Sequence, residues 1–260
     1  MIVIAGPCQV ESVDHTMRMA ERLDAIAAQL RTTVIFKASF DKANRTSGGS
    51  PRGAGISVAM AAFQKIKASF DMKIVTDVHE PWQCAEVCEV VDILQIPALL
   101  CRQTDLIEAA ALTGRGVNIK KGQFLAAEDM THAVSKARAA GADEIFATER
   151  GTSFGYRDLI VDMRSIVRMK QSGADAVIFD CTHAVQTPGS AAGATGGERA
   201  MSEPLARAAI AAGADGLFLE CHDDPASAPS DGAVMMKIDD VSGFLGRMVD
   251  LHRFVGAYSI

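Results

Sequence analysis

Short apolar runs rich in β-branched residues alternate with amphipathic segments along the whole chain. Between the runs, apolar positions recur every three or four residues, so that segments 19–30 and 130–137 each place them on one helical face. A seventh helical segment is expected from near Pro204 to Gly213, because proline favours helix starts and glycine helix ends. The apolar runs predict eight strands, at 2–5, 33–36, 73–76, 93–96, 117–119, 145–147, 176–179 and 216–219.

Strands that alternate with helices predict a parallel sheet. Eight such units in about 250 residues most simply close into a (β/α)8 TIM barrel. The chain has 260 residues and contains no obvious linker, so we predict one barrel domain over residues 1–260. An open doubly wound sheet is the alternative, but the first run is not followed by the glycine-rich turn of dinucleotide-binding folds.

Three long segments without a clear pattern follow the second, seventh and eighth predicted strands. They span residues 39–54, 182–200 and 221–237. Long loops in a compact domain are usually functional or disordered. All three would emerge at the carboxyl-terminal face of the barrel, where barrel enzymes carry out their chemistry.

A polar or ionisable residue stands at the end of every predicted strand. Because parallel strands of a closed barrel point the same ends toward one mouth, these side chains are expected to converge. Any one of them could have a structural role, such as a lysine paired with an aspartate, but all eight together indicate a functional site. The eight residues are Cys8, Lys37, Asp77, Gln95, Lys120, Arg150, His183 and Glu220.

A thiolate, an imidazole and carboxylates within this set suggest a metal site. The candidate ligands are Cys8, His183, Glu220 and, in the loop after the eighth strand, Asp231. Mixed sulfur, nitrogen and oxygen ligands suit one divalent ion such as Zn(II), Fe(II) or Mn(II), whereas Mg(II) and Ca(II) avoid sulfur. Cys8 taken alone fits equally well as a small buried side chain behind a glycine-proline turn.

The remaining strand ends carry positive charge. Lys37, Lys120 and Arg150 would repel one another in a single cavity unless they bound an anion such as a phosphate ester with a carboxylate. The loop after the second strand adds further cations, of which Arg45 could hold a second phosphate, although a solvated basic loop is the simpler reading of that segment. A metal beside sites for two phosphates fits the condensation of two phosphorylated metabolites better than hydrolysis.

Composition excludes several partner classes. With a formal net charge of -6 the surface is a poor match for nucleic acid or an anionic membrane. The sequence has no apolar run near the roughly 18 residues of a membrane span and no signal-like start, so we expect a cytoplasmic protein. Six scattered cysteines suggest reduced thiols, and Cys84 and Cys88 are expected in core packing more than in a metal pair.

The motifs at the strand ends resemble those of the 3-deoxy-D-manno-octulosonate 8-phosphate synthases, over essentially the whole chain. The matching stretches are GPCQVES at 6–12, KASFDKANR at 37–45, TDVHEP at 76–81, QIPALLCRQTDL at 95–106, NIKKGQF at 118–124, ERGTSFGY at 149–156, FDCTHAVQ at 179–186 and SDG at 230–232. The resemblance implies a barrel, usually a homotetramer, that joins phosphoenolpyruvate to D-arabinose 5-phosphate and releases phosphate, toward lipopolysaccharide.

The resemblance also implies roles for individual residues. Phosphoenolpyruvate would be held by Lys37, Lys120 and Arg150, with Gln95 and Gln123 nearby. The pentose phosphate would be bound by Asn44, Arg45 and Thr46. The reacting centre would contain Lys42, Asp77, His183 and Asp231. The metal-free branch of the family has Asn in place of Cys8, and an amide binds a borderline ion poorly, so this chain resembles the metal-dependent branch. A mobile flap over the site and a plain surface loop are equally compatible with the glycine-rich segment 189–197.

Three other functions are also compatible with the sequence. The sister family, the 3-deoxy-D-arabino-heptulosonate 7-phosphate synthases, is the nearest, but it usually has Lys-Pro-Arg-Thr where this chain has KANR at 42–45. A metallohydrolase would use the metal without needing three cations. A metal sensor would need the four ligands alone.

Overall fold

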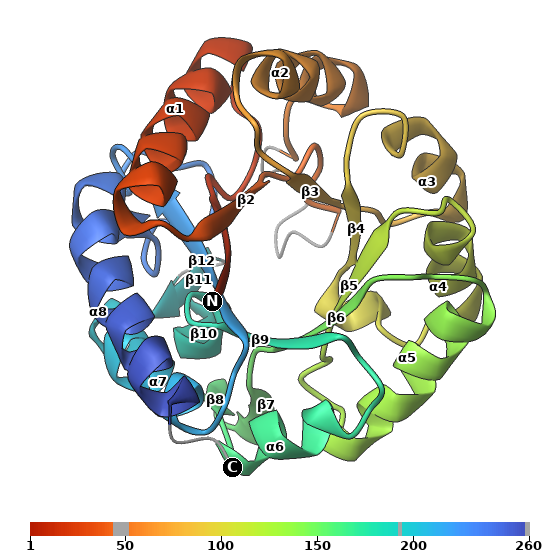
Figure 1. The fold of residues 1–260 in the computed structure, drawn as a ribbon, viewed down its shortest axis with the longest axis vertical. Helices are drawn as coiled ribbons and strands as arrows, with labels where there is room; N and C mark the ends of the chain where they lie inside the picture. The colour runs from red at the N-terminus through yellow and green to blue at the C-terminus, as the bar shows by residue number, and fades with distance from the viewer. Residues whose placement is uncertain (44–51, 192–193, 258–260) are drawn as a thin grey trace.

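The computed structural model describes residues 1–43, 52–191 and 194–257, and within these ranges eight parallel strands form a closed barrel (Figure 1). Each strand pairs with the next around the barrel, and β12 pairs with β1, which closes the ring. The predicted barrel is therefore confirmed. Its strands are β1 (Ile2–Gly6), β2 (Thr33–Lys37), β3 (Ile74–Asp77), β4 (Ile93–Ile96), β5 (Gly116–Lys120), β6 (Ile145–Glu149), β9 (Ala176–Asp180) and β12 (Gly216–His222).

Helices surround the barrel on the outside, one after each strand (Figure 1). The first, α1, begins after Ser12, whose side chain accepts a hydrogen bond from the backbone N–H of His15. It ends at Arg31, which takes a left-handed conformation with φ 50°. The helices are α1 (Val13–Leu30), α2 (Ile56–Ser69), α3 (Pro81–Val87), α4 (Thr104–Ala111), α5 (Met130–Ala139), α6 (Arg164–Lys170), α7 (Ser202–Ala211) and α8 (Ile238–Gly256).

Apolar side chains form two separate clusters because strand residues alternate between the two faces of the sheet. A large cluster fills the space between the strands and the helices, and includes Phe36, Phe63 and Phe179. A smaller one, with Ile4 and Phe218, fills the inside of the barrel. The inner cluster leaves the carboxyl-terminal part of the barrel interior to polar side chains.

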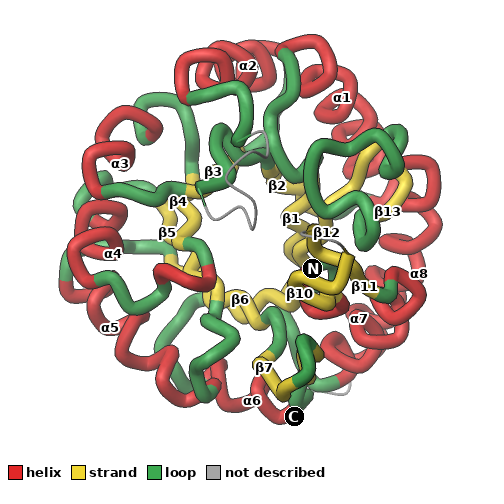
Figure 2. Tube along the Cα trace, turned by 180° about the vertical axis from the view of Figure 1, so that it is seen from behind, coloured by secondary structure: helices red, strands yellow, loops and turns green. Residues whose placement is uncertain are grey.

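Several short elements follow the carboxyl ends of the barrel strands, and Figure 2 shows them from the side opposite to Figure 1. The segment 182–200, expected to lack regular structure, contains the hairpin of β10 (Gln186–Ala191) and β11 (Ala194–Gly197). A second hairpin, β7 (Thr152–Gly155) with β8 (Asp158–Ile160), was not expected from the sequence. In the third loop, β13 (Met236–Lys237) pairs with the end of β12.

Candidate active site

The inside of the barrel changes from apolar to polar toward the carboxyl ends of the strands. Alternation carries Ile178 to Asp180 and Phe218 to Glu220, so that polar residues form a layer above the inner apolar cluster. All members of this layer are buried, and hydrogen bonds or ion pairs join each of them to at least one other member. They are Lys37, Asp77, Gln95, Asn118, Lys120, Thr148, Asp180 and Glu220.

Cys8 lies at the rim of this layer because the chain after β1 packs closely on β2. A Cβ atom on Gly6 would lie 2.0 Å from the backbone oxygen of Lys37, so only glycine permits this approach. The backbone N–H of Ser39 then donates to the oxygen of Cys8 at 3.2 Å, which fixes the residue that carries the thiol.

The thiol of Cys8 faces the loop after β12. Its Sγ atom lies 2.7 Å from the hydroxyl of Ser230 and donates to Oδ2 of Asp231 at 3.2 Å. Ligand atoms of Cys8, Glu220 and Asp231 lie within 4.8 Å of one another. Burial and the nearby charge of Glu220 raise the pKa of Cys8 well above that of an ordinary thiol, so a cation would be needed to hold the thiolate.

His183 adjoins this group through Glu220. Its Nδ1 atom lies 2.7 Å from Oδ2 of Asp180, so that in the neutral ring the proton is on Nδ1 and a lone pair is left on Nε2. That Nε2 lies 3.6 Å from Oε2 of Glu220, a buried oxygen without a hydrogen-bond partner in the described part of the chain. Two acceptors facing each other in a buried place fit a cation between them.

The two positively charged lysines of the layer differ in their surroundings. Nζ of Lys37 is already surrounded by acceptors, with Glu220 at 3.1 Å and Asp77 at 3.3 Å. Burial alone would lower the pKa of Lys37, but these carboxylates outweigh burial and raise it. Nζ of Lys120 lies 2.5 Å from Asp180 and 3.8 Å from the centre of the Phe218 ring, and burial lowers its pKa despite that partner.

Arg150 has a donor nitrogen that no described residue uses. It is buried, one nitrogen of its guanidinium donates to Oε1 of Gln186 at 3.0 Å, and its Nη1 atom has no hydrogen-bond partner within the described ranges. Burial lowers the pKa of Arg150, although a guanidinium remains charged at neutral pH. The oxygen of the Gln123 amide is also buried and without a partner in the described chain. Unmade hydrogen bonds of this kind are expected where a ligand completes them.

Gln186 connects the cationic side of the site to the thiol side. While its oxygen accepts from Arg150, its Nε2 donates to Oδ1 of Asp231 at 2.6 Å. One side chain thus joins the candidate anion site to a candidate metal ligand.

The remaining candidates that the structure describes, Asp77 and Lys42, lie beside Lys37 and share its partner Ser39. Asp77 accepts hydrogen bonds from Ser39 and, at 2.5 Å, from the amide of Gln95. Lys42 donates to the same Ser39 hydroxyl at 3.0 Å. Burial alone would lower the pKa of Lys42, but nearby Cys8 and carboxylates such as Glu220 raise it, so the ammonium keeps its proton at neutral pH.

Comparison with known proteins gives a family. The model of the DAHP synthetase I family matches residues 1–255. The chain is 53% identical over 244 residues to the 2-dehydro-3-deoxyphosphooctonate aldolase of Rickettsia canadensis, covering 94% of this chain and 89% of the relative. It is 50% identical over 257 residues to that of Brucella ovis (99% and 92%) and 49% identical over 257 residues to that of a Bradyrhizobium species, strain BTAi1 (99% and 90%).

The chain belongs to the DAHP synthetase I family. Within it, the chain groups with the 2-dehydro-3-deoxyphosphooctonate aldolases, which are the 3-deoxy-D-manno-octulosonate 8-phosphate synthases that its motifs resemble. The octulosonate phosphate synthase group is therefore supported by whole-chain similarity as well as by motifs.

The structure places most of the residues predicted for an octulosonate phosphate synthase at one end of the barrel. Asn44, Arg45 and Thr46 lie outside the described residues. Gln95 and Glu220, expected at strand ends, lie inside strands β4 and β12 and point into the barrel network.

Sequence reasoning missed several members of the site. The most important is Asp180, which pairs with Lys120 and His183, although it stands in a quoted motif. Asp180 points inward because it alternates with Ile178 along β9. The predicted strand ended at residue 179, so this alternation was not extended to Asp180. Two others were also missed: Asn118, inside a predicted strand, donates to Gln95 at 2.8 Å, and Gln186, in a segment expected to be irregular, accepts from Arg150.

Proposed function

We propose that the chain condenses phosphoenolpyruvate with D-arabinose 5-phosphate and water, giving 3-deoxy-D-manno-octulosonate 8-phosphate and inorganic phosphate. One observation carries most weight. Gln186 bonds both to Arg150, whose buried Nη1 has no hydrogen-bond partner among the described residues, and to Asp231 beside the Cys8 thiol. The candidate anion site and the candidate metal site would therefore be adjacent, which suits a reaction between a phosphorylated acid and an aldehyde. The names of the relatives support the same reaction.

The donor set supports one bound divalent ion. Cys8, His183, Glu220 and Asp231 would hold Zn(II), Fe(II) or Mn(II), because a thiolate, an imidazole and two carboxylates match borderline ions. Oε2 of Glu220, which accepts no hydrogen bond from the described residues and lies opposite His183 Nε2, supports the fit of such an ion. When bound, the ion would supply Lewis acidity toward a carbonyl or a water molecule.

The buried cationic side chains of the site would hold phosphoenolpyruvate. Arg150 and Lys120 are buried, and Nη1 of Arg150, which has no partner in the described ranges, can donate to a phosphate oxygen. Lys37 is less available, because two carboxylates already neutralise it; its role is then to position Glu220 and Asp77 more than to bind substrate directly.

The bond changes balance without a redox partner. The C3 carbon of phosphoenolpyruvate attacks the aldehyde of the open-chain pentose phosphate, and water adds at C2. The hemiketal phosphate then loses inorganic phosphate by C–O cleavage, which leaves the 2-oxo acid. Lys42, which keeps its proton at neutral pH, would give a proton to the alkoxide formed from the aldehyde, while Lys120 and Arg150 stabilise the phosphate charge.

We also propose a cytoplasmic homotetramer on a route to lipopolysaccharide. Apolar side chains that a lone chain leaves in water support self-association, among them Phe154 and Ile160 of the β7–β8 hairpin, at 77% and 50% exposure. A Phe154→Ser variant is expected to lower the mass measured by sedimentation, while an apolar swap, Phe154→Leu, keeps it. Among the described helices, none is long and apolar enough to cross a bilayer.

One assay tests the reaction and separates it from its rivals. Phosphoenolpyruvate is mixed with the metal-loaded protein and either D-arabinose 5-phosphate, D-erythrose 4-phosphate or no aldose, and released phosphate is measured. Phosphate release that requires the pentose phosphate supports the proposal, whereas preference for erythrose 4-phosphate assigns the chain to the sister synthases. Release without an aldose indicates a hydrolase, and no release in any mixture contradicts catalysis of this kind.

A further inference from the structure

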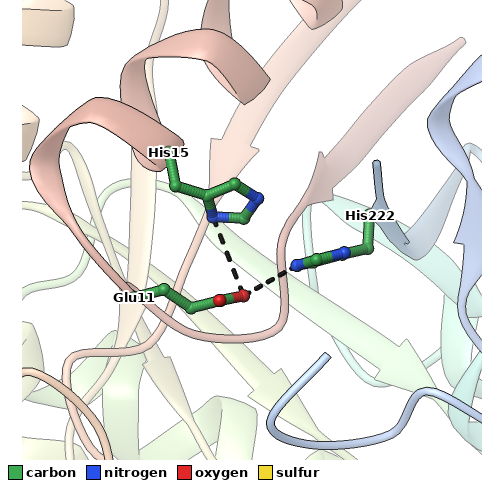
Figure 3. A group of neighbouring side chains, drawn as sticks. All are labelled: Glu11, His15 and His222. Carbon is green, nitrogen blue, oxygen red and sulfur yellow. Dashed lines mark hydrogen bonds and ion pairs between the residues drawn. The ribbon is translucent and has the colours of Figure 1, made fainter. Parts of the chain in front are cut away.

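A second group of metal-binding side chains lies outside the site described above. It consists of Glu11, His15 and His222, shown in Figure 3. Glu11 belongs to the loop between β1 and α1, His15 to the first turn of α1, and His222 is the last residue of β12. The group shares no residue with the Cys8 site and contains no sulfur.

Glu11 stands between the two histidines. Its Oε1 atom lies 2.7 Å from Nε2 of His222 and 3.7 Å from Nδ1 of His15, and one ligand atom from each residue lies within 4.8 Å of the others. The imidazole rings are buried, with 8% and 4% side-chain exposure, whereas the Glu11 side chain is 31% exposed. The two imidazoles are therefore shielded from solvent, whereas the carboxylate between them remains accessible.

His15 presents a lone pair to this meeting point. Its Nε2 lies 3.1 Å from Oδ1 of Asp223, so Nε2 carries the proton of the neutral ring. The other nitrogen, Nδ1, is buried without a hydrogen-bond partner among the described residues and faces the Glu11 carboxylate. An imidazole lone pair against a carboxylate oxygen is unfavourable unless a cation lies between them.

Asp223 stands behind both rings. The same Oδ1 atom that accepts from His15 also lies 3.1 Å from Nδ1 of His222. A carboxylate behind a ligating imidazole orients the ring and makes its other nitrogen more basic. Asp223 is thus placed to orient both histidines, as carboxylates commonly do for imidazole ligands in protein metal sites.

His222 requires one proton to move before it can ligate. At present its Nδ1 accepts from the backbone N–H of Asp224 at 2.9 Å, and Nε2–H points at Glu11. With the proton on Nδ1, the ring would donate to Asp223 and turn the Nε2 lone pair toward Glu11. The Asp224 N–H keeps a partner, because it already donates to Oδ1 of Asp223 at 3.2 Å.

We propose that Glu11, His15 and His222 bind a second divalent ion of the Zn(II) class, with Asp223 as a positioning residue. Two imidazoles and one carboxylate suit Zn(II) and its neighbours Co(II) and Ni(II), and leave a position for water on the solvent side. The ion would join the start of α1 to the end of β12 and to the loop that carries Asp231. Its role is therefore to fix that loop beside the catalytic site.

The test counts ions in metal-stripped protein titrated with Co(II), a probe that distinguishes the two sites. A thiolate ligand gives Co(II) an intense near-ultraviolet charge-transfer band, which a site without sulfur lacks. Equilibrium dialysis of the wild type is expected to give two ions per chain. Glu11→Gln and His15→Ala are each expected to give one ion with the thiolate band retained, which also reports that the barrel is folded.

The matched controls are Cys8→Ala and His132→Ala. Cys8→Ala is expected to keep one ion without the thiolate band, and His132→Ala, which removes an exposed histidine of α5, to keep two. Asp223→Asn should weaken binding of the second ion by about 10- to 100-fold. A single wild-type ion that gives the thiolate band, or two ions in His15→Ala, would overturn the second site. A single ion that depends on His15 and gives no thiolate band would keep the second site and remove Cys8 as a ligand instead.

Discussion

Nζ of Lys37 lies 3.1 Å from Oε1 of Glu220, and both side chains are buried inside the barrel. Removing one partner of a buried ion pair leaves the other charge uncompensated. Because Asp77 also contacts Lys37, we expect Glu220→Gln to lower the free energy of unfolding by about 3 kcal/mol at pH 7, the low end for such pairs. Urea unfolding with a chelator present measures this effect without the contribution of a bound ion.

The control for this change is Glu203→Gln. Glu203 pairs with Arg247 at 2.8 Å on the surface, where an ion pair contributes about 1 kcal/mol or less. Equal losses of unfolding free energy in the two variants would show that the buried Lys37–Glu220 pair stabilises the fold no more than a surface pair.

The same pair predicts how stability depends on pH. Burial alone would raise the pKa of Glu220, but the positive charges of a protonated His183 and of Lys37 lower it to about 2 from an ordinary 4.5. A carboxyl whose pKa is lowered on folding contributes stability above its unfolded pKa and loses it as pH falls toward the folded pKa. We therefore expect the difference between the wild type and Glu220→Gln to be constant from pH 7 to about 5 and to shrink steadily below pH 4.5. A difference that stays constant down to pH 3 would contradict this linkage.

The fold was predictable because its signals are local and repeated. Each apolar run marks a buried strand, and parallel closure then brings the strand ends together, so Cys8 and Glu220 could be grouped from positions far apart in the chain. The β7–β8 hairpin was missed because its turn is made by Tyr156 and Arg157, both with positive φ, instead of the glycine or asparagine that usually marks such a turn.

The sequence predicted which residues lie in the site better than it predicted which of them contact one another. The residues that neutralise Lys37 come from β3 and β12, and no local pattern shows that they reach it. Gln186 belongs to a segment expected to be irregular, so its bonds to Arg150 and Asp231 appeared only in the structure. Such contacts depend on side-chain directions at distances that spacing along the chain does not encode.

Asp180 is expected to act as a positioning residue for both halves of the site. It accepts the Nδ1 proton of His183 at 2.7 Å and lies 2.5 Å from Lys120. Asp180→Asn should weaken metal binding by about 10- to 100-fold, because the ring loses the carboxylate that makes Nε2 basic. It should also raise the KM for phosphoenolpyruvate, because Lys120 loses its partner and its position.

Metal titration and steady-state kinetics of Asp180→Asn measure the two effects separately. The control is Asp175→Asn, since Asp175 also accepts a backbone N–H and pairs with an arginine, Arg138, but at the surface. If both variants keep wild-type metal affinity, Asp180 does not act through His183.

Arg150 is expected to bind the phosphate of phosphoenolpyruvate. Arg150→Ala removes the only guanidinium that Gln186 contacts in the described structure, and should lower kcat/KM by more than tenfold, or about 1.4 kcal/mol. Arg150→Lys keeps the charge but loses the paired donors, so it should recover part of the activity at most. Kinetics of Arg164→Ala, which removes an exposed arginine, should match the wild type; an unchanged Arg150→Ala profile would remove Arg150 from the site.

Turnover is expected to require a metal ion that Cys8 helps to bind. The Cys8 thiol lies 3.2 Å from Asp231 and keeps its proton when no cation is near, because burial and Glu220 raise its pKa. A chelator should therefore abolish turnover, and Zn(II), Fe(II) or Mn(II) should restore it. Cys8→Ala should lose tight metal binding while its circular dichroism stays that of the wild type, because the side chain is small and sits at the barrel rim.

The matched variant is Cys88→Ala, which removes a half-buried thiol on the outer side of the barrel, where Cys88 packs beside the large apolar cluster. This variant should keep both metal content and turnover. Full activity of metal-stripped wild type would exclude a catalytic ion even if Cys8 binds one. Wild-type metal affinity in Cys8→Ala would instead place the ion on the nitrogen and oxygen donors alone, with the thiol as a packing group.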